Sequence, residues 1–169
     1  VQISGAKNSA LPLLISSILA DGISVFRRVP HLQDIQTTEL LLKGLGLVTQ
    51  WDRKSEPSTM TLDGSRLNQF EAPYDLVRKM RASVLVLGPL VARLGKAKVS
   101  LPGGCAIGAR PINFHLTALE RLGAKITLEG GYVLAEAKRL KGNRVVFDFP
   151  SVGATENLMM AASLAEGET

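Results

Sequence analysis

Three glycines recur at a nearly constant spacing along this chain, which limits the folds that it can adopt. Gly22, Gly95 and Gly167 are separated by 73 and 72 residues, and each follows a segment rich in apolar residues. The four residues ending at the first and last of these glycines are also alike, Leu19-Ala-Asp-Gly22 and Leu164-Ala-Glu-Gly167. Helix stops at a fixed period are typical of an internal repeat. The sequence therefore predicts an α/β fold built from repeats of about 70 residues.

Cap and turn residues predict the elements of the first repeat. Asn8 or Ser9 can cap a first helix, and residues 23–25 alternate like a short strand. Asp34 can cap a second helix that ends around Gly44, and a further strand follows it. The unit is predicted to run helix, strand, helix, strand.

A similar order is predicted for the second repeat. Residues 75–93 favour a helix that is bent at Gly88-Pro89, and residues 98–101 favour a strand. A glycine-rich loop, a helix over 111–122 and a hairpin over 124–137 come next, with the hairpin turning at two adjacent glycines. A third helix is expected to start at about residue 152.

These repeats predict how the chain is divided. Residues 1–72 and 73–148 form two whole units, and residues 149–169 form the beginning of a third. Since the third unit stops where a strand should begin, we expect the chain to be part of a longer protein.

The composition fits a folded domain in a reducing compartment. With 169 residues, of which 46% are hydrophobic and 21% charged, the chain can bury one full-sized core. Its single cysteine cannot form an internal disulfide bond, which favours a cytoplasmic protein. The apolar stretches are interrupted well short of the roughly 20 residues of a membrane helix, so no membrane partner is expected.

Charge and motifs narrow the class of ligand. A net charge of +5 favours anionic partners, but the basic residues are spread along the chain and only 5% of residues are aromatic. A phosphorylated small substrate is therefore favoured over nucleic acid. The sequence has no clustered Cys and His pattern for zinc, no phosphate-binding Gly-x-x-x-x-Gly-Lys motif and no Gly-x-Ser-x-Gly, so no metal or cofactor is expected.

The loop Pro102-Gly-Gly-Cys-Ala-Ile-Gly-Ala-Arg-Pro111 is the most informative candidate for chemistry. Its glycines allow the backbone to approach a ligand closely, while Cys105 and Arg110 supply a reactive thiol and a fixed cation. The alternative is a tight connection around an inert, buried cysteine. The local sequence leaves these two alternatives equal.

Four further residues can serve either a site or the structure. Arg110 precedes Pro111 at a predicted helix start, where an anion is favoured, and Lys7 lies at another such start. Arg81 falls in an apolar segment and either turns out to solvent or pairs with an anion. His115 could act as an acid or base near neutral pH, or simply pack and hydrogen-bond locally.

Five segments resemble the UDP-N-acetylglucosamine enolpyruvyl transferases, in the same order and at compatible spacing. They are residues 3–12, 72–76, 80–83, 101–111 and 150–157. The resemblance implies a fold of two similar domains, each a threefold-repeated inside-out α/β barrel, with substrates bound in the cleft between them. It also implies that this chain is most of the first domain, truncated in its third repeat, and that the second domain is absent from it.

The same resemblance implies an activity and a set of site residues. The activity is transfer of the enolpyruvyl group from phosphoenolpyruvate to UDP-N-acetylglucosamine, with Cys105 as proton donor and as the target of fosfomycin-type epoxides. The implied phosphoenolpyruvate ligands are Lys7, Asn8 and Arg110. The implied nucleotide-sugar ligands are Arg81, Arg110, Pro111, Ile112, Asn113, Phe114, Ser151, Val152 and Gly153.

Two departures and two alternatives accompany this resemblance. Some members of the family carry Asp where Asn113 stands and Lys where Phe149 stands, so a charge contact to the nucleotide is in doubt at both positions. One alternative is the sibling enzyme that acts on shikimate 3-phosphate, which shares the fold but lacks the cysteine loop. The other is an inactive nucleotide-sugar-binding remnant.

Overall fold

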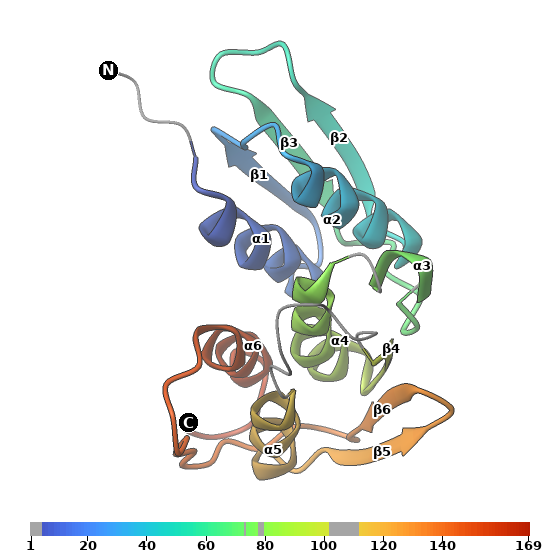
Figure 1. The fold of residues 1–169 in the computed structure, drawn as a ribbon, viewed down its shortest axis with the longest axis vertical. Coiled ribbons are helices and arrows are strands. Elements are labelled where there is room, and N and C mark those ends of the chain that lie inside the picture. Colours follow the sequence, from blue (N-terminus) through green and yellow to red (C-terminus); the bar gives the residue numbers. More distant parts are fainter. Residues whose placement is uncertain (1–4, 73, 78–79, 102–111) are drawn as a thin grey trace.

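The computed structural model describes residues 5–72, 74–77, 80–101 and 112–169, and the side chain of Arg81 lies outside this description (Figure 1). The fold is a mixed α/β arrangement with a small sheet at each end. Figure 1 shows helix α2 beside the sheet of β1, β2 and β3, and α4 and α5 near the sheet of β4, β5 and β6. No helix in the described part of the chain combines the length and the apolar character that crossing a membrane requires.

The first sheet is antiparallel, and its central strand is the last of the three along the chain. Its order is β1-β3-β2, so the two outer strands both pair with β3. Met60 and Leu62 of β3 are fully buried against the helices, whereas Ile23 and Val25 of β1 lie on the exposed face. The elements of this part are α1 (Lys7–Ser16), a 3-10 turn η1 (Ser17–Leu19), β1 (Ile23–Arg27), α2 (Gln33–Gly44), β2 (Val48–Asp52) and β3 (Thr59–Asp63).

The second sheet has the same plan. Its order is β4-β6-β5, again antiparallel throughout with the last strand in the centre. The elements are α3 (Tyr74–Val77), a 3-10 helix η2 (Arg81–Val86), α4 (Leu87–Leu94), β4 (Lys96–Ser100), α5 (Asn113–Arg121), β5 (Lys125–Glu129), β6 (Tyr132–Glu136) and α6 (Val152–Ala162). A continuous core joins the two parts, and its largest buried side chains include Leu14, Ile15, Leu62, Leu87, Leu90 and Leu119. Burial of each such side chain stabilises the fold by about 1.5–3 kcal/mol.

A backbone contact recurs at the start of both sheets. The carbonyl of Gly22 accepts a hydrogen bond of 2.9 Å from the N–H of Gly64, and the carbonyl of Gly95 accepts one of 2.8 Å from Ala137. Both glycines, like Gly167, have a positive φ. Only Gly95 directly caps a helix, since η1 ends at residue 19 and α6 at residue 162.

Arg93 connects the two parts of the molecule. It lies in the last turn of α4, and its guanidinium donates to the carbonyl of Ile18 at 2.8 Å, donates to the carbonyl of Ala20 and pairs with Asp21 at 3.1 Å. The last carbonyls of a helix have no partner within it. Arg93, which lies on a helix much later in the chain, therefore supplies hydrogen-bond donors to the carbonyls at the C-terminal end of the first helical segment.

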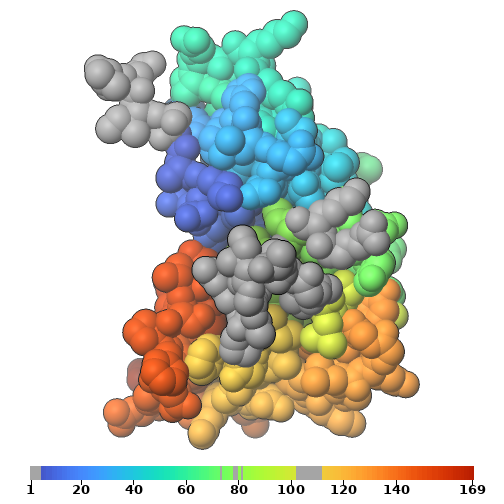
Figure 2. All heavy atoms as spheres, viewed as in Figure 1, coloured from blue at the N-terminus to red at the C-terminus, as the bar shows by residue number. Residues whose placement is uncertain are grey.

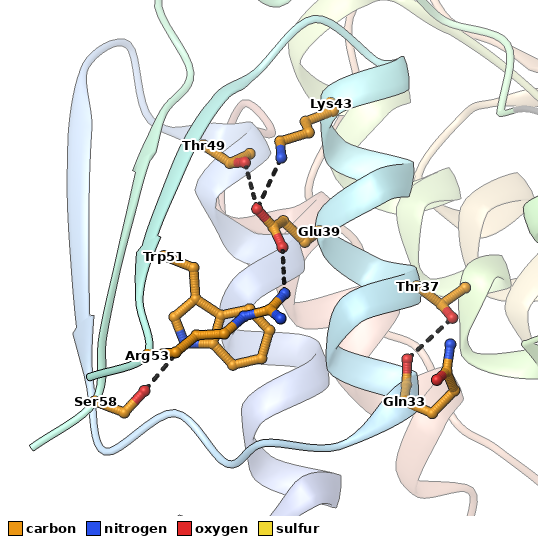
Figure 3. A network of polar contacts seen from close by, with 8 residues as sticks. All are labelled: Gln33, Thr37, Glu39, Lys43, Thr49, Trp51, Arg53 and Ser58. Carbon is orange, nitrogen blue, oxygen red and sulfur yellow. Dashed lines mark hydrogen bonds and ion pairs between the residues drawn. The ribbon is translucent and has the colours of Figure 1, made fainter. Parts of the chain in front are cut away.

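A polar network joins α2 to β2 (Figure 3). The side chain of Glu39 accepts a hydrogen bond of 2.9 Å from Thr49 and lies 2.9 Å from the Lys43 ammonium and 3.7 Å from the Arg53 guanidinium. That guanidinium also lies 4.3 Å from the centroid of the Trp51 ring. Burial alone would raise the pKa of Glu39, but these hydrogen bonds and charges outweigh it and leave the pKa below its ordinary value.

The structure corrects several predicted elements. The single bent helix predicted over 75–93 is wrong, because a short helix, a 3-10 helix and α4 occupy this region. Pro89 is the third residue of α4, in the first turn, where its missing N–H costs no hydrogen bond. The unit also contains a strand that was not predicted, β3, which fills the centre of the sheet.

The predicted helix caps at the N-terminal end are also wrong. Ala6 and Leu32 hold the N-cap positions of α1 and α2, and neither helix has a side-chain cap. Asp34 lies in the first turn of α2 and pairs instead with Lys7. The predicted hairpin over 124–137 is confirmed, since Gly130 and Gly131 join β5 and β6 with φ of 57° and 81°.

Candidate functional site

A cleft of about 620 Å³ lies between the starts of α1, α5 and α6 and the helix η2. Its size is within the range of pockets that bind small molecules. Figure 2 shows the segments of α1 (dark blue), α5 (yellow) and α6 (orange-red) on one face of the molecule. The lining residues are Asn8, Leu11, Pro12, Ala82, Val84, Leu85, Ile112, His115, Pro150, Ser151, Val152, Gly153 and Glu156.

The start of α1 is held against a tight turn. A Cβ at Gly5 would lie 2.1 Å from the carbonyl oxygen of Arg28, so only glycine allows this approach, and Arg28 itself has a φ of 59°. Lys7 begins α1, and its ammonium lies 2.9 Å from the Asp34 carboxylate. Asn8, the next residue, lines the cleft. The local fold thus brings Lys7 and Asn8 to the edge of the cleft in a fixed backbone.

The start of α6 supplies the opposite wall. Ser151 is the N-cap, and its hydroxyl accepts a hydrogen bond of 3.3 Å from the N–H of Ala154. Val152 and Gly153 form the first turn and line the cleft beside it. Because helix N-termini carry free N–H groups and a partial positive charge, this wall favours an anionic ligand.

The residues at the start of α5 that were predicted to bind the nucleotide sugar lie in two different environments. Ile112, just before the helix, lines the cleft, but Asn113 and Phe114 are not among the lining residues. Asn113 is exposed, and the ring of Phe114 lies edge-on to Phe147, with 6.0 Å between the ring centroids. The cleft therefore includes only part of the segment that was predicted to bind the nucleotide sugar.

Several predicted site residues cannot be placed in this way. Cys105, Arg110 and Pro111 lie outside the described residues, as does the side chain of Arg81, whose backbone begins η2. Asn8, Ile112, Ser151, Val152 and Gly153 are the predicted residues that the cleft brings together. Lys7 is not among the lining residues: it precedes Asn8 in the chain, and its ammonium pairs with Asp34, which does not line the cleft either.

Two titratable residues in the cleft were not predicted as ligands. Burial lowers the pKa of His115 from 6.5 to about 4, so its ring is neutral at neutral pH, and burial raises the pKa of Glu156. The sequence signal for Glu156 was its spacing of three from Gly153, which places both on one face of α6. Among the described residues, no three His, Cys, Asp or Glu side chains gather closely enough to hold a metal ion.

Comparison with known proteins identifies relatives over the whole chain. A family model described as EPSP synthase (3-phosphoshikimate 1-carboxyvinyltransferase) matches residues 1–169. UDP-N-acetylglucosamine 1-carboxyvinyltransferases from Desulforapulum autotrophicum and Desulfatibacillum aliphaticivorans are 59% and 60% identical over 169 residues. The one from Thermodesulfovibrio yellowstonii is 54% identical. The chain is covered completely in each case but spans only 39–40% of the relatives' length.

Solved structures share the fold at lower identity. The enolpyruvyl transferase NikO from Streptomyces tendae matches 99% of this chain and 39% of its own, with a TM-score of 0.80 and 22% identity. An EPSP synthase from Acinetobacter baumannii matches 99% of this chain and 39% of its own, with a TM-score of 0.71 and 19% identity. The chain therefore belongs to the EPSP synthase (3-phosphoshikimate 1-carboxyvinyltransferase) family, in which it is similar to the UDP-N-acetylglucosamine 1-carboxyvinyltransferases.

Proposed function

We propose that the protein containing this chain transfers the enolpyruvyl group of phosphoenolpyruvate to the 3-hydroxyl of UDP-N-acetylglucosamine and releases phosphate. The observation that carries the proposal is the identity of 54–60%, over all 169 residues, with relatives that are named for this reaction. The reaction is the first committed step of peptidoglycan precursor synthesis, and we propose that it takes place in the cytoplasm.

Cys105 is the proposed proton donor. A thiol with a pKa of about 8.5 is protonated at neutral pH and can give its proton to the methylene carbon of phosphoenolpyruvate. The neighbouring carbon then becomes electrophilic, and the 3-hydroxyl oxygen of the sugar bonds to it while the hydroxyl proton is lost to a general base or to water. Loss of phosphate from that carbon and of one proton from the former methylene carbon restores the double bond. Arg110, five residues away in the same loop, would favour the thiolate that forms in the first step.

The proposed ligands divide between the two substrates. Lys7, Asn8 and Arg110 are proposed for phosphoenolpyruvate, and Arg81, residues 110–114 and residues 151–153 for the nucleotide sugar. The cleft supports part of this assignment, because Asn8, Ile112 and residues 151–153 line it together. The N-terminus of α6 further supports a ligand with phosphate groups.

We also propose that this chain is most of the first of two domains. This domain would be an inside-out α/β barrel built from repeats. The chain would contain two whole repeats, residues 1–72 and 73–148, and part of a third, residues 149–169. Two sheets with the same strand order and the recurring hydrogen bond to Gly22 and Gly95 support the repeat. This chain spans about 40% of the relatives' length, which supports a second domain in the full protein. We propose that this second domain closes the open side of the cleft.

The sibling reaction with shikimate 3-phosphate is a second candidate, because the matching family model carries its name. To separate the two, we would give the full-length protein limiting phosphoenolpyruvate and equal amounts of both acceptors, and identify the product by mass. We expect enolpyruvyl-UDP-N-acetylglucosamine. A shikimate product would establish the second candidate. Binding of the nucleotide sugar without phosphate release would indicate a non-catalytic binding protein.

A further inference from the structure

His115 is buried where three helices meet. Only 8% of the residue is exposed, and its Nδ1 atom lies 3.2 Å from Nδ2 of Asn157 on α6. The side-chain oxygen of Asn157 accepts a hydrogen bond of 2.8 Å from the backbone N–H of Gly88 on α4. A Cβ at Gly88 would lie 2.5 Å from this same oxygen, so the contact requires glycine. The three residues form a chain of hydrogen bonds from α4 through α6 to α5.

This chain determines where the imidazole carries its proton. Because Oδ1 of Asn157 accepts from the backbone, its Nδ2 group faces His115, and an amide nitrogen can only donate. Nδ1 of His115 must therefore accept, and the single proton of the neutral ring resides on Nε2. The backbone N–H of Gly88, which can only donate, thus fixes the tautomer through the orientation of the Asn157 amide.

The protonated edge of the ring lies next to Gly153 of α6. An ideal Cβ at Gly153 would lie 3.5 Å from Cε1 and 3.6 Å from Nε2 of His115, and both residues line the cleft. No hydrogen-bond partner of Nε2 occurs among the described residues, and Nε2 is not one of the buried atoms that lack a partner. A hydrogen-bond donor therefore lies in the wall of the cleft, beside the N-terminus of α6.

We infer that His115 binds the nucleotide sugar as a neutral hydrogen-bond donor through Nε2, and that Asn157 and Gly88 are positioning residues that fix this tautomer. The inference rests on the proposed function, since it assigns a further contact to the same cleft. It replaces the alternative in which His115 exchanges protons during the reaction. The acceptor is an oxygen atom of UDP-N-acetylglucosamine.

The residues around His115 agree with its role as a neutral hydrogen-bond donor. Glu156 of α6 is the other titratable residue that lines the described cleft, and α1 contributes uncharged Asn8, Leu11 and Pro12. Burial keeps the pKa of His115 near 4, so the ring stays neutral across the physiological range. A donor that carries no charge can bind an oxygen of the ligand without the cost of burying an ion.

The test uses nitrogen-15 NMR of the histidine rings in the full-length protein, with His115 assigned by its loss in H115Q. We expect Nε2 protonated and Nδ1 unprotonated between about pH 6 and 8, and a shift of the Nε2 signal on saturation with UDP-N-acetylglucosamine. Asn157→Asp should reverse the tautomer, because a carboxylate can only accept from Nδ1. A charged ring, a proton on Nδ1 in the wild type, or an Nε2 signal that the bound ligand leaves unchanged would overturn the inference.

Affinity provides a second readout. The side-chain amide of H115Q can place a donor where Nε2 was, so its dissociation constant for UDP-N-acetylglucosamine should stay within about 3-fold of wild type. H115N is too short and should bind about 10-fold more weakly, with the thermal midpoint of each variant recorded. H31Q is the matched control, because His31 is exposed and lies outside the cleft. Equal loss in H115Q and H115N overturns the inference, whereas no binding by the wild type overturns the proposed function itself.

Discussion

Lys7 and Lys43 form similar ion pairs, but we propose different roles for them. Each ammonium lies 2.9 Å from a carboxylate, and each side chain is 47% exposed. Lys43 belongs to the network between α2 and β2, whereas Lys7 begins α1 next to Asn8 of the cleft. Exposed ion pairs contribute little stability, typically up to about 1 kcal/mol. We therefore expect Lys7 to contribute more to the proposed binding of phosphoenolpyruvate than to folding.

Lys7→Ala should separate these roles. We expect kcat/KM for phosphoenolpyruvate to fall about 100-fold, since a charge-assisted contact to the substrate is lost, while the free energy of unfolding changes by less than about 1 kcal/mol. Lys43→Ala, the matched control, should keep its activity. Steady-state kinetics and urea unfolding of the full-length variants check both. Equal effects of the two substitutions on kcat/KM would contradict the proposed contact of Lys7.

At this scale the sequence alone predicted part of the cleft. Asn8, Ile112 and Gly153 were predicted from segments resembling a known family, and they do line it. Leu85 and His115 were not predicted to line the cleft, because apolar positions on a helix and a lone histidine have the same pattern whether they face a core or a cavity. Only the packing of α5 and η2 against α6 distinguishes these cases.

At the scale of elements, α2 is joined to β2 by a charge as well as by apolar packing. Glu39 is 7% exposed, and its carboxylate forms ion pairs with two cations and accepts a hydrogen bond from the Thr49 hydroxyl. On the same helix, Leu41 and Leu42 are buried in the core. The folded-state pKa of Glu39 is lowered, so its contribution to stability is fully present above the unfolded value of 4.5. That contribution is lost as the pH falls through the folded value.

Glu39→Gln should therefore lower stability in a pH-dependent way. At pH 7 we expect the free energy of unfolding to fall by about 1 kcal/mol, because a buried acceptor loses its charge. The difference from wild type should shrink below the ordinary carboxylate pKa of 4.5. Urea unfolding between pH 7 and pH 3.5 measures it, with exposed Glu120→Gln as the control. A difference that stays constant with pH would show that the charge of Glu39 is not the cause.

Besides the helix predicted over 75–93, two helix caps and one strand were not predicted correctly from local sequence. Asp34 is a residue type that often caps helices, but its carboxylate forms an ion pair with the nearby ammonium of Lys7 instead. Strand β3 has only Met60 and Leu62 as buried apolar residues, and it is stable because β1 and β2 pair with it on both sides. Both outcomes depend on partners that lie elsewhere in the chain.

At the scale of the whole molecule, the two sheets share one strand order, which agrees with the repeat that we propose from the glycine period. Both have their last strand in the centre, and both begin with a glycine carbonyl that accepts from the residue after β3 or β6. The period could not reveal how the units are joined. Arg93 of α4 reaches back to the carbonyls of Ile18 and Ala20, a contact between units that no property within one unit specifies.

We propose that Cys105 protonates phosphoenolpyruvate during transfer to UDP-N-acetylglucosamine. The rate of phosphate release by the full-length protein and by its Cys105→Ala variant, with both substrates present, is a direct test of this role. We predict release that requires both substrates and falls about 100- to 10,000-fold in the variant, as expected for loss of a general acid. Cys105→Asp should retain part of the rate, because a carboxylic acid can still donate a proton. Wild-type turnover by Cys105→Ala would contradict the account.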